Sequence, residues 1–133
     1  MQYAQIQVLP PTPPGGVTAG IDWATADHVA CVVDSAGRVL DRISVAHDRA
    51  GIRKLVSALR AAGAAEVAIE RGDGVLVDAL LAAGLTVVVI TSRQVKNLRS
   101  RYGSAGAKDD RFDAFVLADV LRTDRARLRP LVL

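Results

Sequence analysis

Apolar residues in the first third of the chain occur in short runs that are rich in β-branched side chains. Three such runs cover residues 17–23, 28–34 and 38–46. Short turns separate them, and Asp34-Ser35-Ala36-Gly37 is the clearest, because Asp, Ser and Gly favour tight reversals of the backbone. The pattern predicts an antiparallel meander of three strands.

The middle of the chain alternates between helical and strand-like spacing. A helix is predicted from Asp48, which caps its first turn, to Gly63, which ends it. Its apolar stripe consists of Ile52, Leu55, Val56 and Leu59. A strand over residues 66–70, a helix over 74–83 and a strand over 85–90 follow. Both strands are apolar enough to be covered on two faces, which is typical of parallel strands joined by helices.

A segment after residue 107 places acids where a helix should bury apolar side chains. At ~100° per residue, the apolar stripe consists of Ala114, Leu117, Val120 and Leu121. Asp110 and Asp113 fall on this stripe, whereas Arg111, Asp119 and Arg122 fall on the opposite, solvent-facing side. Burying an unpaired carboxylate costs several kcal/mol, so the acidic face is expected to meet a cation. A helix-capping role for Asp110 would explain one acid but not both.

Two further acids end predicted strands. Asp22 closes the run that begins near Val17, and Glu70 closes the run 66–70 just before a glycine-rich turn. Ligands collect beyond the carboxyl ends of parallel strands, so both acids could belong to one ligand site. Taken alone, each acid is equally compatible with a strand end that is simply exposed to solvent. Four converging carboxylates would repel one another unless a divalent metal were present. Oxygen ligands without His or Cys favour Mg²⁺ or Mn²⁺.

The combination of these acids resembles a known family. An acid on the first strand, a Glu on a later strand and the motif Lys108-Asp109-Asp110-Arg111-Phe112-Asp113-Ala114 resemble the RuvC-like DEDD domain of a bacterial insertion-sequence transposase family related to pilin-gene invertases. The resemblance covers roughly residues 17–125. It implies an α/β, ribonuclease-H-like mixed five-stranded sheet with flanking helices. It also implies a catalytic and metal-binding tetrad made of Asp22, Glu70, Asp110 and Asp113.

The chain departs from the family pattern in two places. Asp109 stands where a small polar residue is commoner, and Arg71-Gly72 follows Glu70 where small hydroxyl residues are expected. Transposases of this family also carry a C-terminal domain with a nucleophilic serine and are directed to DNA by a structured RNA. The serines before the acidic helix are interpreted as loop or cap residues, and not as substitutes for that nucleophilic serine. They are Ser92, Ser100 and Ser104.

The domain organisation expected from these patterns has three parts. Four of the five prolines lie in residues 1–15, which are predicted to form a disordered leader. Residues 16–125 are predicted to form the RuvC-like DEDD catalytic domain. Residues 126–133 are expected to be a basic tail that leads toward a missing C-terminal region.

Composition narrows the class of protein. With 133 residues, 50% hydrophobic content and a mean hydropathy of +0.25, the chain can bury one core. It has no apolar run long enough for a signal peptide or a membrane span. Its single cysteine, Cys31, lies in an apolar strand and is expected to be buried, which suits a reducing cytoplasm. His28 and His47 lie near strand ends and are interpreted as structural or exposed.

Basic residues concentrate in the C-terminal third. The chain has 17 Lys and Arg against 14 Asp and Glu, yet residues 93–129 hold ten bases and five acids. Such a surface favours phosphate backbones. The residues expected to bind nucleic acid are Lys108, Arg99, Arg101 and Arg111. Because aromatic residues are few, contacts are expected to be with the DNA backbone and to show little sequence choice.

The sequence therefore favours divalent-metal-dependent DNA strand cleavage and transfer during insertion-sequence transposition. The expected partners are DNA, a structured guide RNA in the full-length protein and further copies of the chain. A truncated, non-catalytic module that binds nucleic acid or mediates oligomerisation is the alternative. A more distant alternative is the first hairpin of actin-like sugar kinases, which residues 20–39 also resemble, but it leaves the motif at 108–114 unexplained.

Overall fold

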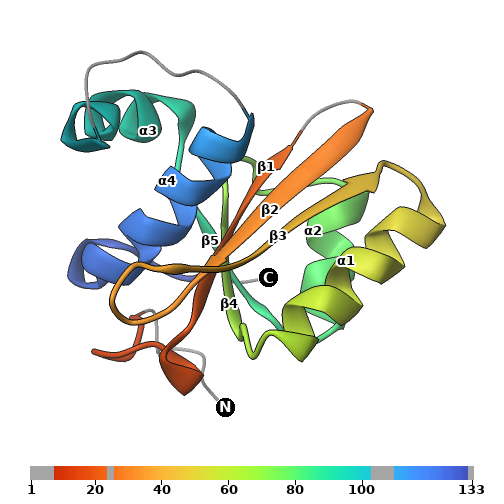
Figure 1. Cartoon of the computed structure of the whole chain (residues 1–133), viewed down its shortest axis with the longest axis horizontal. Helices are drawn as coiled ribbons and strands as arrows, with labels where there is room; N and C mark the ends of the chain where they lie inside the picture. Colours follow the sequence, from red (N-terminus) through yellow and green to blue (C-terminus); the bar gives the residue numbers. More distant parts are fainter. Residues whose placement is uncertain (1–7, 24–25, 103–109, 132–133) are drawn as a thin grey trace.

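The protein is built around one mixed β-sheet (Figure 1). The computed structural model describes residues 8–23, 26–102 and 110–131, without the side chains of residues 99, 100 and 110–112. Its five strands stand in the order β3-β2-β1-β4-β5. They are β1 (Thr18–Trp23), β2 (Asp27–Val33), β3 (Val39–Ala46), β4 (Glu66–Ile69) and β5 (Thr86–Val89).

The strand directions match the predicted meander and the alternating segment that follows it. β2 pairs antiparallel with both β1 and β3, whereas β4 pairs parallel with both β1 and β5. The turn between β2 and β3 forms as expected, because the Asp34 carboxylate accepts hydrogen bonds from the backbone N–H groups of Ala36 and Arg38, each at 2.9 Å. The predicted ribonuclease-H-like mixed five-stranded sheet is confirmed.

In the part of the chain that the structure describes, four α-helices cover the two faces of the sheet. They are α1 (Arg49–Ala61), α2 (Val75–Ala82), α3 (Ser92–Leu98) and α4 (Asp110–Thr123), and short 3-10 turns occur at η1 (Pro14–Gly16), η2 (Arg99–Tyr102) and η3 (Arg125–Arg127). Figure 1 shows α1 and α2 on one face and α4 on the other. Asp48 caps α1 as predicted, because the Gly51 N–H donates to its carboxylate at 2.6 Å.

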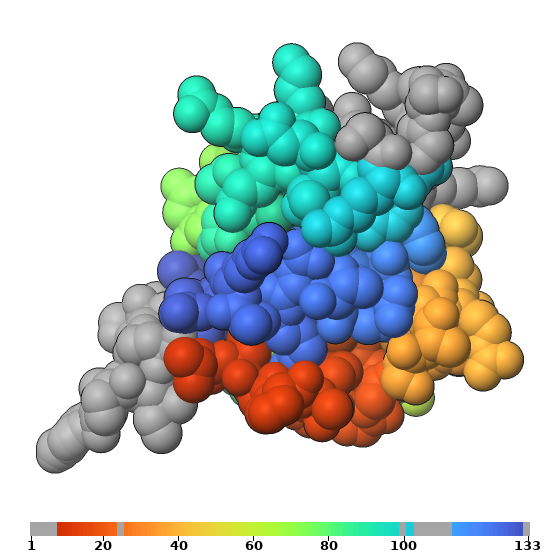
Figure 2. All heavy atoms as spheres, turned by 90° about the vertical axis from the view of Figure 1, so that its left-hand side faces the viewer, coloured from red at the N-terminus to blue at the C-terminus, as the bar shows by residue number. Residues whose placement is uncertain are grey.

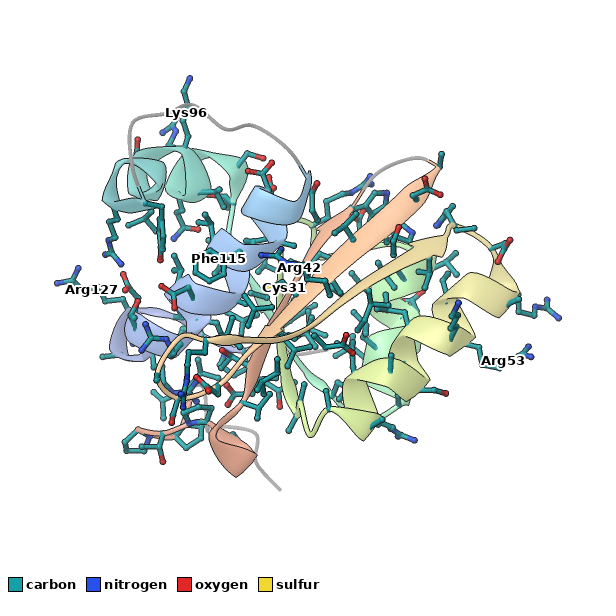
Figure 3. The ribbon with its side chains drawn as sticks, viewed as in Figure 1. Cys31, Arg42, Arg53, Lys96, Phe115 and Arg127 are labelled. Carbon is teal, nitrogen blue, oxygen red and sulfur yellow. The ribbon has the colours of Figure 1, made fainter. Side chains whose placement is uncertain are left out.

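Each sheet face packs its own apolar cluster. The face toward α1 and α2 buries alternate residues of β1 and β4, such as Ile21 and Ile69, against Leu55 and Leu80. The face toward α4 buries Ala68 and Val88 against Leu117 and Leu121. Cys31 is fully buried on this second face, as predicted, where it packs with Ala114, Ala118 and Phe115 (Figure 3). Burial raises the pKa of its thiol.

Residues on both sides of the predicted catalytic domain, 16–125, also pack against it. Leu9 is buried, and the Pro10 carbonyl accepts a hydrogen bond at 2.9 Å from Arg125 Nε. On the other side, Pro130 forms a bridge with Val88 of β5. Residues 8–15 of the expected leader and residues 126–131 of the expected tail therefore contribute contacts to this domain.

Candidate functional site

Two of the predicted acids lie at the carboxyl ends of neighbouring parallel strands. β1 and β4 are paired in the register Ala19↔Val67 to Ile21↔Ile69. Asp22 follows Ile21, and Glu70 follows Ile69, so the two acids occupy adjacent positions at the same edge of the sheet. Both side chains are half-buried. The strand adjacency expected from the family resemblance is confirmed.

A glycine brings the acidic helix against the first strand. A Cβ on Gly20 would lie 2.5 Å from the Ala118 N atom, 2.7 Å from Leu117 Cβ and closer still to the Ala114 carbonyl. Such distances are too short for a real methyl group, so α4 packs on β1 as closely as backbone atoms permit. The Thr18 hydroxyl also donates to the Ala118 carbonyl at 2.9 Å.

The position of α4 determines where its acids lie. Asp113 immediately precedes Ala114, whose carbonyl touches Gly20, and Gly20 lies two residues before Asp22. Figure 1 shows the N-terminal end of α4 at the same end of the sheet as the end of β1. Asp113 is half-buried in this arrangement. The Asp110 side chain lies outside the described residues, although its backbone begins α4.

Glu70 has a neighbour that the sequence analysis did not assign. Ser92 Oγ, at the first residue of α3, donates a hydrogen bond to Glu70 Oε2 at 2.7 Å. The start of α3 is held by a reciprocal cap: the Thr91 N–H donates to Gln94 Oε1 at 2.8 Å, and the Gln94 N–H donates to Thr91 Oγ1 at 3.3 Å. The end of β5 therefore places a hydroxyl beside the candidate ligand.

An aromatic and basic group borders the acids on the other face of the sheet. The Arg71 guanidinium lies 4.4 Å from the centre of the Trp23 ring, a cation–π contact, and half of its side chain remains exposed. Trp23 also contacts the rings of His28 and His47.

The two histidines form a pair. His28 is fully buried, and its Nε2 lies 2.7 Å from His47 Nδ1, within hydrogen-bonding distance. Burial and the neighbouring His47 lower the pKa of His28. The interpretation of His28 as structural agrees with this buried position.

Asp119 is not solvent-facing, and that prediction is wrong. Its side chain is 10% exposed, and its carboxylate accepts hydrogen bonds from the Tyr102 hydroxyl at 2.9 Å and from Arg122 Nε at 2.8 Å. Arg122 reaches on to the Ser35 carbonyl in the turn between β2 and β3. Figure 2 shows α4 flanked by α3, by the N-terminal segment and by this turn, while the part of its surface between them faces outward.

The predicted nucleic-acid-binding residues have different positions. Arg101 pairs with Asp124 through two hydrogen bonds of 3.0 Å, and Asp124 follows the C-terminal end of α4, away from Asp110. This pairing lowers the pKa of Asp124. Lys108 and the side chains of Arg99 and Arg111 lie outside the described residues. Lys96 and Arg127, by contrast, project outward on the α4 side of the molecule (Figure 3).

A buried ion pair ties the opposite end of the sheet to the C-terminal segment. Arg125 donates to both oxygens of Glu66 at 2.6 and 2.7 Å, and both side chains are at most 6% exposed. Glu66 begins β4, so this pair lies at the far end of the strand from Glu70. The sequence analysis did not identify this contact.

The donor set suits a hard divalent cation. Asp22, Glu70 and Asp113 are carboxylates on or next to three elements that meet at one edge of the sheet, and Asp110 is on the same helix as Asp113. In the part of the chain that the structure describes, no three His, Cys, Asp or Glu side chains are grouped closely enough to hold a metal ion. Oxygen donors of this kind match Mg²⁺ or Mn²⁺, which keep water ligands and complete their shell with substrate phosphates.

A wide apolar cavity of about 630 Å³ lies between α1 and α2, on the face opposite α4. Ile52, Val56 and Val75 line it, and among the described acids of the predicted tetrad neither Asp22, Glu70 nor Asp113 does. None of the helices among the described residues has the length and apolarity that crossing a membrane requires.

Comparison with known proteins places the chain in a family. The model of a family described as Transposase, comprising DEDD transposases of the IS110 type, matches residues 19–133. The mini-circle putative transposase for IS117 of Streptomyces coelicolor is 38% identical over 120 residues, which cover 86% of this chain and 29% of that protein. The putative transposase y4uE of Sinorhizobium fredii is 37% identical over 112 residues, covering 80% of this chain and 31% of that protein.

The fold has a counterpart among solved structures. Thermus thermophilus RuvC, in complex with a Holliday junction substrate, matches with a TM-score of 0.60 and 19% identity over 86% of this chain and 99% of that one. This likeness concerns the fold. The chain spans about three tenths of the length of the two transposases. Because the family model matches most of this chain, residues 19–133, the chain belongs to the IS110-type DEDD transposase family.

Proposed function

We propose that this domain supplies the acidic, metal-binding half of a DNA strand cleavage and transfer site used in insertion-sequence transposition. The observation that carries the proposal is the close packing of α4 on Gly20, two residues before Asp22, together with the parallel pairing of β1 and β4, whose ends lead into Asp22 and Glu70. Asp110 completes the proposed tetrad from the first turn of the same helix.

The residues that would hold Mg²⁺ or Mn²⁺ are Asp22, Glu70, Asp110 and Asp113. Such ions, when bound, stabilise the attacking and leaving oxygens of an in-line phosphodiester displacement. The chain itself fixes the geometry, because β1, β4 and α4 are joined by backbone pairing and close packing. Rigid placement of the acids contributes to rate by removing the cost of assembling them in each cycle.

The proposed DNA surface lies on the α4 side and over the strand ends. Lys108, Arg99 and Arg111 remain proposed phosphate contacts, and the exposed Lys96 and Arg71 add positive charge at the same edge of the sheet. Arg101 is proposed to act chiefly through its pairing with Asp124. Binding by this domain should be salt-sensitive and nearly independent of sequence, since counterion release dominates contacts with the backbone.

Other parts of the proposed activity are assigned to a chain as long as the relatives. Guide RNA recognition and assembly with further copies are proposed for a chain of the relatives' length. Complete strand transfer is likewise proposed for a chain of that length. The present chain should retain slow, Mn²⁺-favoured nicking of branched DNA, and a four-way junction is the substrate of choice because the RuvC that shares the fold binds one.

The test is nicking of a labelled four-way junction with Mn²⁺. The variants Asp22→Asn, Glu70→Gln, Asp110→Asn and Asp113→Asn should each abolish nicking. Asp78→Asn is the matched control, because Asp78 is exposed on α2, on the opposite face of the sheet. Nicking that survives Asp22→Asn would reject the proposed site. Junction binding without any nicking would favour the alternative of a non-catalytic nucleic-acid-binding module.

A further inference from the structure

We propose that Ser92 is a positioning residue for the metal site, holding the Glu70 carboxylate in the orientation that binds the cation. The inference rests on the proposed function, because it assigns a partner to one of the proposed ligands. It starts from the hydrogen bond of 2.7 Å between Ser92 Oγ and Glu70 Oε2.

Glu70 needs such a partner because of where it lies. It follows the last residue of β4 and leads into the segment Arg71-Gly72-Asp73-Gly74, where two glycines allow wide backbone freedom. A Glu side chain has several rotatable bonds, so ordering it for metal binding has an entropic cost. A hydrogen bond that already fixes one oxygen reduces that cost.

Ser92 is itself held independently of Glu70. The reciprocal cap between Thr91 and Gln94 fixes the first turn of α3, and Val95 anchors the helix in the core at 2% exposure. The hydroxyl therefore lies at a fixed point of the scaffold, whereas the carboxylate lies at the end of a flexible side chain. The direction of control runs from Ser92 to Glu70.

The chemistry of the donor suits this role. A hydroxyl donates one hydrogen bond without adding charge, so it orients the carboxylate and leaves its negative charge available to a cation. Lys or Arg at this position would compete with the metal for the same oxygen atoms. Hydrogen-bonding partners of metal ligands typically contribute about 10–100-fold to metal affinity. Because Ser92 is exposed, we expect the lower end of that range.

The experiment measures Mn²⁺ binding to the 133-residue chain by electron paramagnetic resonance of the free ion, without DNA. Ser92→Ala should weaken Mn²⁺ binding about tenfold. Ser92→Thr, which keeps the hydroxyl, should bind within about threefold of wild type. Thr91→Ala is the matched control: it removes the Thr91 hydroxyl from the cap, but the Thr91 N–H can still donate to Gln94 Oε1 and Val95 still anchors α3. The Ser92 hydroxyl should therefore stay in place, and this variant should bind Mn²⁺ nearly as wild type does.

The outcomes separate this inference from the function on which it rests. If wild type binds Mn²⁺, Glu70→Gln weakens binding and Ser92→Ala does not, the positioning role is wrong while the metal site stands. If Thr91→Ala weakens binding as much as Ser92→Ala, the effect comes from the placement of α3, and the role of the hydroxyl is again rejected. If wild type itself does not bind Mn²⁺ at millimolar concentration, the proposed metal site and this inference fall together.

Discussion

Replacing Gly20 with alanine should both destabilise the domain and disturb its acidic site. The added Cβ would lie 2.5 Å from the Ala118 N atom, whereas ordinary contacts begin near 3.4 Å, so α4 must move by roughly 1 Å. Two of the three clashing atoms belong to the helix backbone and cannot be relieved by a rotamer change. Overpacking of this kind costs about 1–3 kcal/mol, and we expect the upper end for Gly20→Ala.

Thermal unfolding followed by circular dichroism provides the first measurement. For a chain of this size 1 kcal/mol corresponds to a change in Tm of about 3–5 °C, so the melting temperature should fall by about 10 °C. Gly72→Ala is the control, since its Cβ would meet only side-chain atoms, Val89 Cγ2 at 3.2 Å and Leu131 Cδ1 at 3.9 Å, and its stability should change by less than about 1 kcal/mol. A Gly20→Ala protein that melts with wild type, or binds Mn²⁺ with unchanged affinity, would refute the idea that this contact sets the position of Asp113.

Three further predictions concern buried polar groups. Removing Arg125 by Arg125→Met should cost about 3–5 kcal/mol in urea unfolding, because Glu66 is left buried without its partner; a Glu66→Leu/Arg125→Met double variant should recover much of that loss, and failure to recover would contradict the desolvation argument. Asp119→Ala should lower stability by about 1–3 kcal/mol, since it removes the acceptor of Tyr102 and a partner of Arg122, whereas a neutral effect would restore the solvent-facing interpretation. The lowered pKa of His28 means that the unfolded chain takes up a proton more readily than the folded protein, so the stability contributed by neutral His28 is complete above pH ~6.5 and is lost as the pH falls below it. Urea unfolding at pH 8 and 5.5 should show this loss, and His28→Asn should flatten it; an unchanged slope in the variant would assign the effect elsewhere.

Local patterns were sufficient to predict the strands and most of the helices, whereas the order of the strands in the sheet came from the family resemblance. The β2–β3 turn, the Asp48 cap and the parallel strands around α2 all depend on residues close in sequence, and each is present. Helix α3 was missed because its seven residues bury only Val95 among those described and therefore show no apolar stripe. Short helices of this kind are specified by caps and tertiary contacts more than by periodicity.

In the candidate site, too, features set by residues close in sequence could be predicted, whereas contacts between distant residues could not. Asp22 and Glu70 could be identified because strand ends are visible in the apolar pattern, and their adjacency followed from the family's strand order. The Ser92–Glu70 contact joins residues 22 positions apart, and the Glu66–Arg125 pair joins residues 59 apart. Asp119 was misplaced because a helical wheel divides residues between two sides, whereas α4 is covered on more than one side by elements that the wheel does not contain.

The two edges of the sheet differ in how they are protected against strand addition. At the β5 edge, Pro130 bridges Val88, and the Leu131 N–H donates to the Val87 carbonyl at 2.7 Å, so the chain itself occupies these backbone groups. The β3 edge has no such cover among the described residues, but it carries exposed Asp41 and Arg42 and an irregular register opposite β2. Charges and bulges on an edge strand discourage intermolecular β-pairing. The domain thus keeps one edge closed by its own backbone and the other unattractive to neighbours, which should let it be concentrated without forming β-linked aggregates.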